Sequence, residues 1–65
     1  MIDQLPNDID AITTFLHNAG WTYNWTKIEE VWMVGIAKGE TKFVVEHRTL
    51  KRALMLVRNL VLGIN

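Results

Sequence analysis

The sequence predicts an α+β domain of order αβββα, in which a three-stranded antiparallel meander sheet carries both helices on one face. Two observations predict it. Three central segments alternate apolar and polar residues with the period of a β-strand. Before and after them, apolar residues recur at helical spacing. With 65 residues, the chain is expected to form one domain over residues 1–65.

The first helix is predicted over residues 7–19. Asn7 is the expected N-cap, because its side chain can accept a hydrogen bond from the first turn. The stripe that would face the core has the spacing of one helix face: Ile9, Ile12, Leu16 and Ala19. Gly20 is expected to end the helix, since glycine tolerates the positive φ of a C′ residue.

The three strands are predicted over residues 21–27, 31–38 and 41–47. Gly39 is expected to open a two-residue type II′ turn that pairs Ile36 with Phe43. The first hairpin, turning at residues 27–30, is expected to pair Trp25 with Trp32. Both hairpins then place the bulky residues on the face beneath the helices: Trp21, Tyr23, Trp25, Trp32, Val34, Ile36, Phe43 and Val45.

The second helix is predicted over residues 49–62, with Thr49 as N-cap and Gly63 as the residue that ends it. Its core stripe is expected to comprise six residues: Leu50, Ala53, Leu54, Val57, Leu60 and Val61. Because one sheet face holds nearly all the bulky apolar residues, the opposite face is expected to meet solvent or a partner.

Composition bounds the function without assigning one. The hydrophobic fraction is 49%, with three tryptophans, which indicates either a dense core or apolar surface shared with another subunit. No cysteine is present, so disulfides and thiolate metal sites are excluded, and a cytoplasmic location is expected, in the host if the protein is viral. Residues 1–37 carry net charge −4 and residues 38–65 carry +4, which suggests a polar contact surface or head-to-tail pairing, with an ordinary solvated surface as the alternative.

No membrane association is expected. The N-terminus is acidic and lacks the apolar run of a signal peptide. The apolar C-terminal segment is interrupted by Arg58 and Asn59 and is much shorter than the ~20 residues that span a bilayer.

Four apolar residues are predicted to contact a protein partner, either another protein or a second copy in a homodimer. On a helical wheel Met55 and Leu62 fall among polar residues, away from the core stripe. Met33 and Val44 fall on the open sheet face. Scattered surface apolar residues are the ordinary alternative.

Nucleic-acid binding is the alternative function. The basic residues that could contact phosphates lie in the last hairpin and the second helix: Lys38, Lys42, Arg48, Lys51, Arg52 and Arg58. The overall neutrality of the chain and the acidic turn at Glu29 and Glu30 oppose this alternative.

No enzymatic activity, cofactor or metal is expected. His17 and His47 are too few for a zinc site, which needs three or four ligands. The chain has no serine or cysteine nucleophile, and its glycines are scattered rather than gathered in a phosphate-binding loop.

The order αβββα resembles the double-stranded-RNA-binding domain, whose last helix begins with a basic run. Lys51 and Arg52 match that run, whereas residues 27–30 are acidic where the family contacts the minor groove. Residues 15–21 also resemble the helix-to-strand segment of HicA-type toxin nucleases. Their catalytic histidine has no counterpart in residues 31–34, so the resemblance does not imply that activity.

Residues 8–62 resemble small phage and prophage proteins of the phage ABA sandwich type. The matching segments are Gly20-Trp21, a tryptophan-containing strand at residues 31–34 and a Thr-Leu-x-x-Ala helix at residues 49–54. The resemblance implies a phage or mobile-element accessory protein and transfers no functional residue. The predicted function is therefore a non-enzymatic protein-interaction module.

Overall fold

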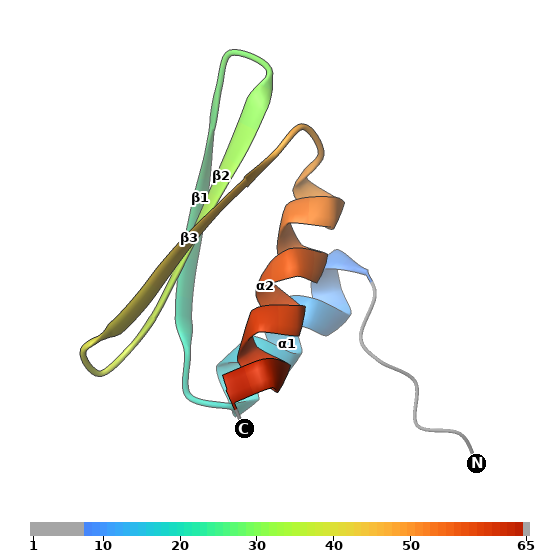
Figure 1. Cartoon of the computed structure of the whole chain (residues 1–65). Helices are drawn as coiled ribbons and strands as arrows, with labels where there is room; N and C mark the ends of the chain where they lie inside the picture. Colours follow the sequence, from blue (N-terminus) through green and yellow to red (C-terminus); the bar gives the residue numbers. More distant parts are fainter. Residues whose placement is uncertain (1–7, 65) are drawn as a thin grey trace.

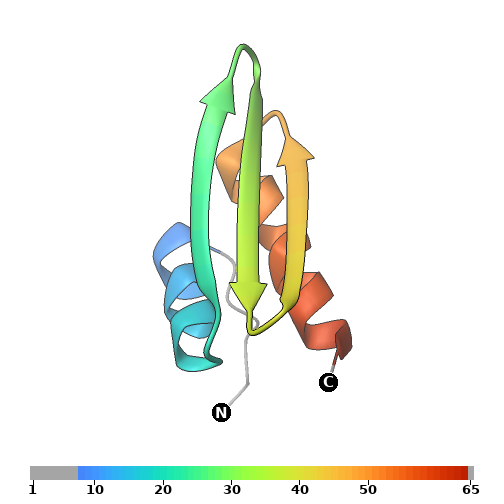
Figure 2. The same cartoon turned by 90° about the vertical axis from the view of Figure 1, so that its left-hand side faces the viewer.

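The computed structural model describes residues 8–64 and confirms the predicted α+β class (Figure 1). Its elements in chain order are α1 (Ile9–Asn18), β1 (Thr22–Ile28), β2 (Val31–Lys38), β3 (Thr41–His47) and α2 (Leu50–Ile64). The strands form one antiparallel sheet of order β1-β2-β3. Both helices lie on the same side of this sheet, α1 behind β1 and α2 behind β2 and β3 (Figure 2).

Helix α1 is fixed at both ends by local hydrogen bonds. The N-cap is Asp8, whose carboxylate accepts a bond from the Ala11 N–H at 2.8 Å; the predicted cap, Asn7, lies outside the described residues. At the other end the Trp21 N–H donates to the Leu16 carbonyl at 2.9 Å, and Gly20 has φ +89°. This is a Schellman motif, so the predicted role of Gly20 is confirmed.

The second hairpin has the predicted register. Ile36 pairs with Phe43 and Val34 with Val45. Gly39 has φ +61°, as a two-residue type II′ turn requires of its first residue.

The predicted register of the first hairpin is wrong by two residues. Trp25 pairs with Val34 rather than with Trp32, and β1 ends at Ile28. Glu29 adopts φ +58° and makes the turn two residues long. A positive φ at a residue other than glycine leaves no sequence signal. A shift of two residues keeps every side chain on its face, so the predicted sheet faces still hold.

Helix α2 begins as predicted and ends later. The Thr49 hydroxyl accepts a hydrogen bond from the Arg52 N–H at 3.3 Å, and the Thr49 carbonyl accepts one from the Ala53 N–H at 3.0 Å. The prediction that Gly63 ends the helix is wrong, because α2 continues to Ile64. Glycine permits a left-handed C′ conformation but does not impose it.

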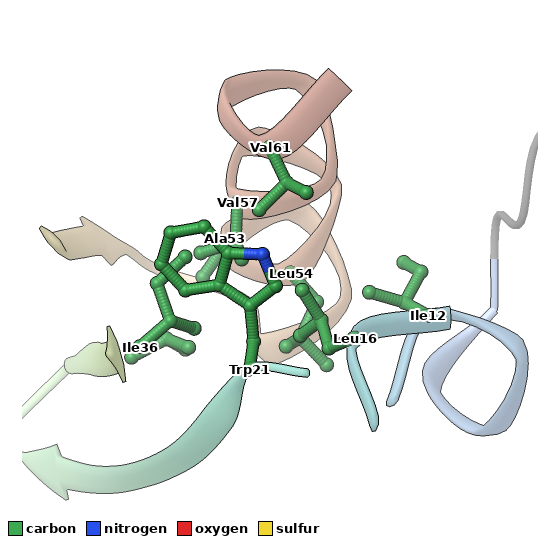
Figure 3. Packing of buried hydrophobic residues seen from close by; sticks show 9 residues of the cluster. Ile12, Leu16, Trp21, Ile36, Ala53, Leu54, Val57 and Val61 are labelled. Carbon is green, nitrogen blue, oxygen red and sulfur yellow. The ribbon is translucent and has the colours of Figure 1, made fainter. Parts of the chain in front are cut away.

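The core lies between the sheet and the two helices (Figure 3). Its buried residues come from both helices, from β2 and from the segment before β1: Ile12, Leu16, Trp21, Val34, Ile36, Ala53, Leu54, Val57 and Val61. The side chain of Trp21 is directed at α2 (Figure 3), and its ring lies 6.2 Å from that of Phe43.

The buried sector of α2 differs from the predicted one. Leu60, expected in the core, is 39% exposed, whereas Arg58, expected on the surface, is only 7% exposed. Because α2 packs against α1 as well as against the sheet, its buried sector is displaced from the stripe that packing on a sheet alone would select.

Two aromatic residues of the helix-facing side lie outside the core. Tyr23, on the edge strand β1, is 38% exposed and stacks on Trp25 at 5.8 Å between ring centroids. Trp32 is half-buried, and the Lys27 ammonium lies 5.7 Å from its ring. The β1–β2 hairpin extends past the start of α2 (Figure 1), which leaves this end of the sheet less covered.

Candidate functional site

The sheet face opposite the helices is covered by no element of the described residues 8–64 (Figure 2). Strand alternation and the observed registers assign eleven side-chain positions to this open face: Thr22, Asn24, Thr26, Ile28, Val31, Met33, Gly35, Ala37, Lys42, Val44 and Glu46. We call this surface the open face. It mixes apolar, neutral polar and charged groups, as ordinary protein–protein interfaces do.

Gly35 makes a hollow in the middle of the open face. It pairs with Asn24 on β1 and with Val44 on β3, and these three residues help to line a depression of about 320 Å³. A Cβ atom at Gly35 would lie 3.2 Å from the Asn24 Oδ1. The hollow therefore offers a side-chain carbonyl on one wall and an apolar side chain, 64% exposed, on the other.

Apolar side chains continue from the hollow toward the first turn. Val31 and Met33 of the central strand are half-buried, and Ile28, which pairs with Val31, is exposed. Met33 pairs with Glu46, so a carboxylate borders this apolar band. The open face thus combines a continuous apolar strip with charged groups at its β3 edge.

The structure separates the four predicted contact residues into two surfaces. Met33 and Val44 lie on the open face, as predicted. Met55 is half-buried and packs against the core, and Leu62 is exposed on α2, in the other layer of the domain. A single partner surface built from all four residues is therefore not formed within one molecule.

A second apolar surface lies on α2 and was not predicted. Leu56, Leu60 and Ile64 follow one another at intervals of four residues and are 43%, 39% and 52% exposed. Ile64 lines a hollow together with Thr41 of β3 and Ala19, the C-cap of α1. We name these three residues of α2 (Leu56, Leu60 and Ile64) the α2 stripe. The four-residue spacing of these side chains can be read from the sequence. The surface was not predicted because Leu60 was assigned to the core.

The predicted basic residues do not share one surface. Lys38 lies at the β2–β3 turn, and its aliphatic end lies over Gly20. Three exposed cations lie at the other end of β3, about 20 Å away at the rise of a strand: Arg48, Lys51 and Arg52. Lys42 is on the open face.

Arg58 is absent from any exposed basic patch because it is buried. Its Nε and Nη2 atoms donate to the Asn59 Oδ1 at 3.0 and 2.8 Å. Its guanidinium is therefore held within the fold and does not present a free fork to a phosphate.

Within residues 8–64, no group of three or more histidine, cysteine or acidic side chains is placed to hold a metal ion. His17 is exposed, and the half-buried His47 accepts a hydrogen bond at Nδ1 from the Thr49 N–H at 3.4 Å. This bond supports the connection between β3 and α2. None of the helices in this part of the chain has the length and apolar character that crossing a membrane requires.

Comparison of the chain with protein-family models, with curated proteins and with solved structures finds no match. The resemblance to phage ABA sandwich proteins stays a prediction.

Proposed function

We propose that this protein is a non-enzymatic protein-interaction module that binds a partner through the open face. The observation that supports this proposal is a sheet face that no element of residues 8–64 covers, although it carries exposed Val44 and Ile28 and half-buried Met33. Val44 lines the hollow and the other two lie between it and the first turn; exposed apolar side chains beside a hollow are typical of interaction sites. By its resemblance, the proposed setting is a phage or mobile-element accessory role in the cytoplasm.

The nucleic-acid alternative has weaker support. With Arg58 buried and Lys38 at the far turn, the remaining cluster comprises Arg48, Lys51 and Arg52. Three phosphate contacts give weak binding that falls steeply with salt. Base stacking needs exposed aromatic rings, and among the aromatic residues of residues 8–64 only Tyr23 is exposed, where its ring already stacks on Trp25.

Capture experiments with surface variants test the proposal. An Ile28→Lys, Met33→Lys double variant places two cations on the open face without touching a buried residue or the β3 edge. We expect wild-type protein to retain a partner from host lysate and the double variant to lose it. Leu62→Lys is the control, because it adds a cation to an exposed apolar position of the other layer. Equal retention by the double variant would contradict the open face as the binding surface.

Fluorescence anisotropy tests the alternative. We expect no submicromolar affinity for duplex DNA, duplex RNA or single strands at about 150 mM salt. Binding of that strength, lost in a folded Arg48→Ala, Lys51→Ala, Arg52→Ala variant, would place the nucleic-acid function first.

A further inference from the structure

Strand β3 is an edge strand with an uninterrupted outer side. It pairs with β2 over its whole length, and no described element pairs with its other edge. Such an edge presents unsatisfied backbone donors and acceptors, which can template pairing with another strand. β3 contains no proline, and its pairing shows no bulge that would block this edge.

The alternation of the hairpin identifies which backbone groups face outward. Lys38 and Thr41 flank a two-residue turn and are therefore a hydrogen-bonded pair. It follows that Lys42, Val44 and Glu46 direct their backbone N–H and C=O groups away from β2.

A side-chain hydrogen bond on the other side of the central strand agrees with this alternation. The Thr22 hydroxyl donates to the Ala37 carbonyl at 3.2 Å, so that carbonyl faces β1 and not β3. Lys42, the β3 residue opposite Ala37, is thus free to direct its own backbone groups outward.

We infer that β3 pairs with β3 of a second copy, antiparallel about a two-fold axis at Val44, to form a homodimer with a continuous six-stranded sheet. A two-fold axis perpendicular to the sheet places the helices of both copies on the same side of the sheet. Two residues that lie opposite each other across the new strand pair must therefore project from the same face of the sheet. Phe43 then lies opposite Val45 of the second copy on the helix side, and the two Val44 side chains meet on the open face.

The charges of β3 are complementary to themselves in this register. About an axis at Val44, Lys42 lies opposite Glu46 of the second copy, and Glu40 of the β2–β3 turn comes opposite Arg48, which follows the strand. The two-fold symmetry repeats each pair, which gives two opposite-charge pairs within the strands and two just beyond their ends. Directly opposed opposite charges stabilise strand pairing, and like charges destabilise it.

Neighbouring registers lose this complementarity. Moving the axis one residue toward the N-terminus places Glu40 opposite Glu46 of the second copy. Moving it one residue toward the C-terminus places Lys42 opposite Arg48. The pattern of charges therefore selects one register and specifies a second copy of this chain, rather than an unrelated strand, as the occupant. The other edge strand, β1, contains one charged residue, Lys27, and has no such pattern.

The dimer also brings the two copies of α2 together. Leu56, Leu60 and Ile64 are exposed on α2, the helix that packs on β2 and β3, and the two-fold axis places the second α2 alongside the first, antiparallel. Strand pairing and apolar helix contact then form together. This inference does not rest on the proposed function: Val44 belongs to both surfaces, but partner capture is tested at Ile28 and Met33, which lie on β1 and β2 rather than on the β3 edge.

Charge-swap variants test the dimer by sedimentation velocity. Lys42→Glu or Glu46→Lys alone replaces attraction by repulsion at both symmetry-related positions, and we expect dimerisation at least tenfold weaker than in the wild type. The double swap restores opposite charges and should dimerise as the wild type does. An equimolar mixture of the two single variants should form heterodimers. In a heterodimer, the residue at position 42 of each copy is opposite a residue of the other charge at position 46 of the other copy.

Two controls separate the register from general charge effects. Lys51→Glu and Glu30→Lys make the same charge changes at exposed positions away from the β3 edge and should leave dimerisation unchanged. Amide hydrogen exchange gives an independent measurement. The Val44 N–H should become protected as concentration rises, whereas the outward N–H of Trp25 on β1 should not.

Several results would overturn the inference. They are a wild type that stays monomeric at high micromolar concentration, a dimer unaffected by the single charge variants, and a double swap that fails to restore it. None of these bears on partner capture through Met33, so the failure of one proposal is distinguishable from the failure of the other.

Discussion

At the scale of single residues, burial rather than residue type decides which side chains hold this domain together. Leu54 is completely buried, whereas Trp32, which the strand pattern assigns to the core, is half-buried and outside the buried cluster. The pattern identifies which face of the sheet Trp32 occupies, but it cannot tell that the helices stop short of it. For Arg58 the prediction was wrong in the opposite direction: it was expected on the surface and is buried, because a charged residue gives no sequence signal of burial.

We expect Leu54→Ala to lower the free energy of unfolding by about 3 kcal/mol, through lost transfer energy and the cavity that remains. Trp32→Ala should cost less, although it removes a larger side chain. Urea denaturation measures both, with Leu62→Ala as an exposed control expected to change stability by less than about 0.5 kcal/mol. A Trp32→Ala variant less stable than Leu54→Ala would contradict the observed core.

At the scale of elements, local chemistry predicts an end or a turn where one residue type is strongly favoured. Gly20 and Gly39 were predicted because both positions need positive φ. The first N-cap was misassigned because Asn7 and Asp8 are equally good caps. The register of the first hairpin was not predictable, since a pattern of period two is unchanged by a shift of two residues.

The turn of the first hairpin carries a conformational cost that a substitution can remove. Glu29 has φ +58°, which disfavours any residue with a Cβ atom. We expect Glu29→Gly to stabilise the protein by about 0.5–1 kcal/mol, since relief of this strain exceeds the added entropy of the unfolded chain. Thermal unfolding measures the change. Glu30→Gly, at the neighbouring position without positive φ, should be neutral or destabilising, and a larger gain there would contradict the turn geometry.

Helix α2 contains a glycine in its last turn. A Cβ atom at Gly63 would meet no atom within 4 Å, and its φ is not positive. Gly63→Ala should therefore stabilise the protein by at most about 1 kcal/mol, because alanine loses less conformational entropy in a helix. Chemical denaturation tests this expectation. Gly39→Ala should be destabilising, because φ there is +61°, and a stabilised Gly39→Ala variant would be inconsistent with the hairpin.

At the scale of the whole molecule, the order and layering of the elements were predictable, and the candidate surfaces were only partly so. Hydrophobic periodicity predicted the strands, both helices and the open face with Met33 and Val44 on it. The α2 stripe was missed because its exposure depends on how α1 and α2 share the sheet, a tertiary property that no local pattern encodes. The net charges of the two chain halves, −4 and +4, likewise did not predict the charge pattern of β3. In that strand Lys42 and Glu46 carry opposite charges at equal distances on either side of Val44.

The two-residue turns have a consequence for the speed of folding. Both hairpins join strands that are adjacent in the chain, so the sheet requires little loop closure, whereas the contact of α1 with α2 joins opposite ends of the domain. We expect the hairpins to form the folding nucleus and α1 to dock after the transition state, with folding in about a millisecond or less.

Stopped-flow or temperature-jump kinetics test this order of events. Val34→Ala, in the central strand, should slow folding, whereas Ile12→Val, in α1, should mainly accelerate unfolding. A slower folding rate in Ile12→Val, with its unfolding rate unchanged, would place α1 in the nucleus instead. If the order holds, the last step of folding is the one that closes the apolar layer over a sheet already formed. Until that step, strand β1 exposes both of its sides.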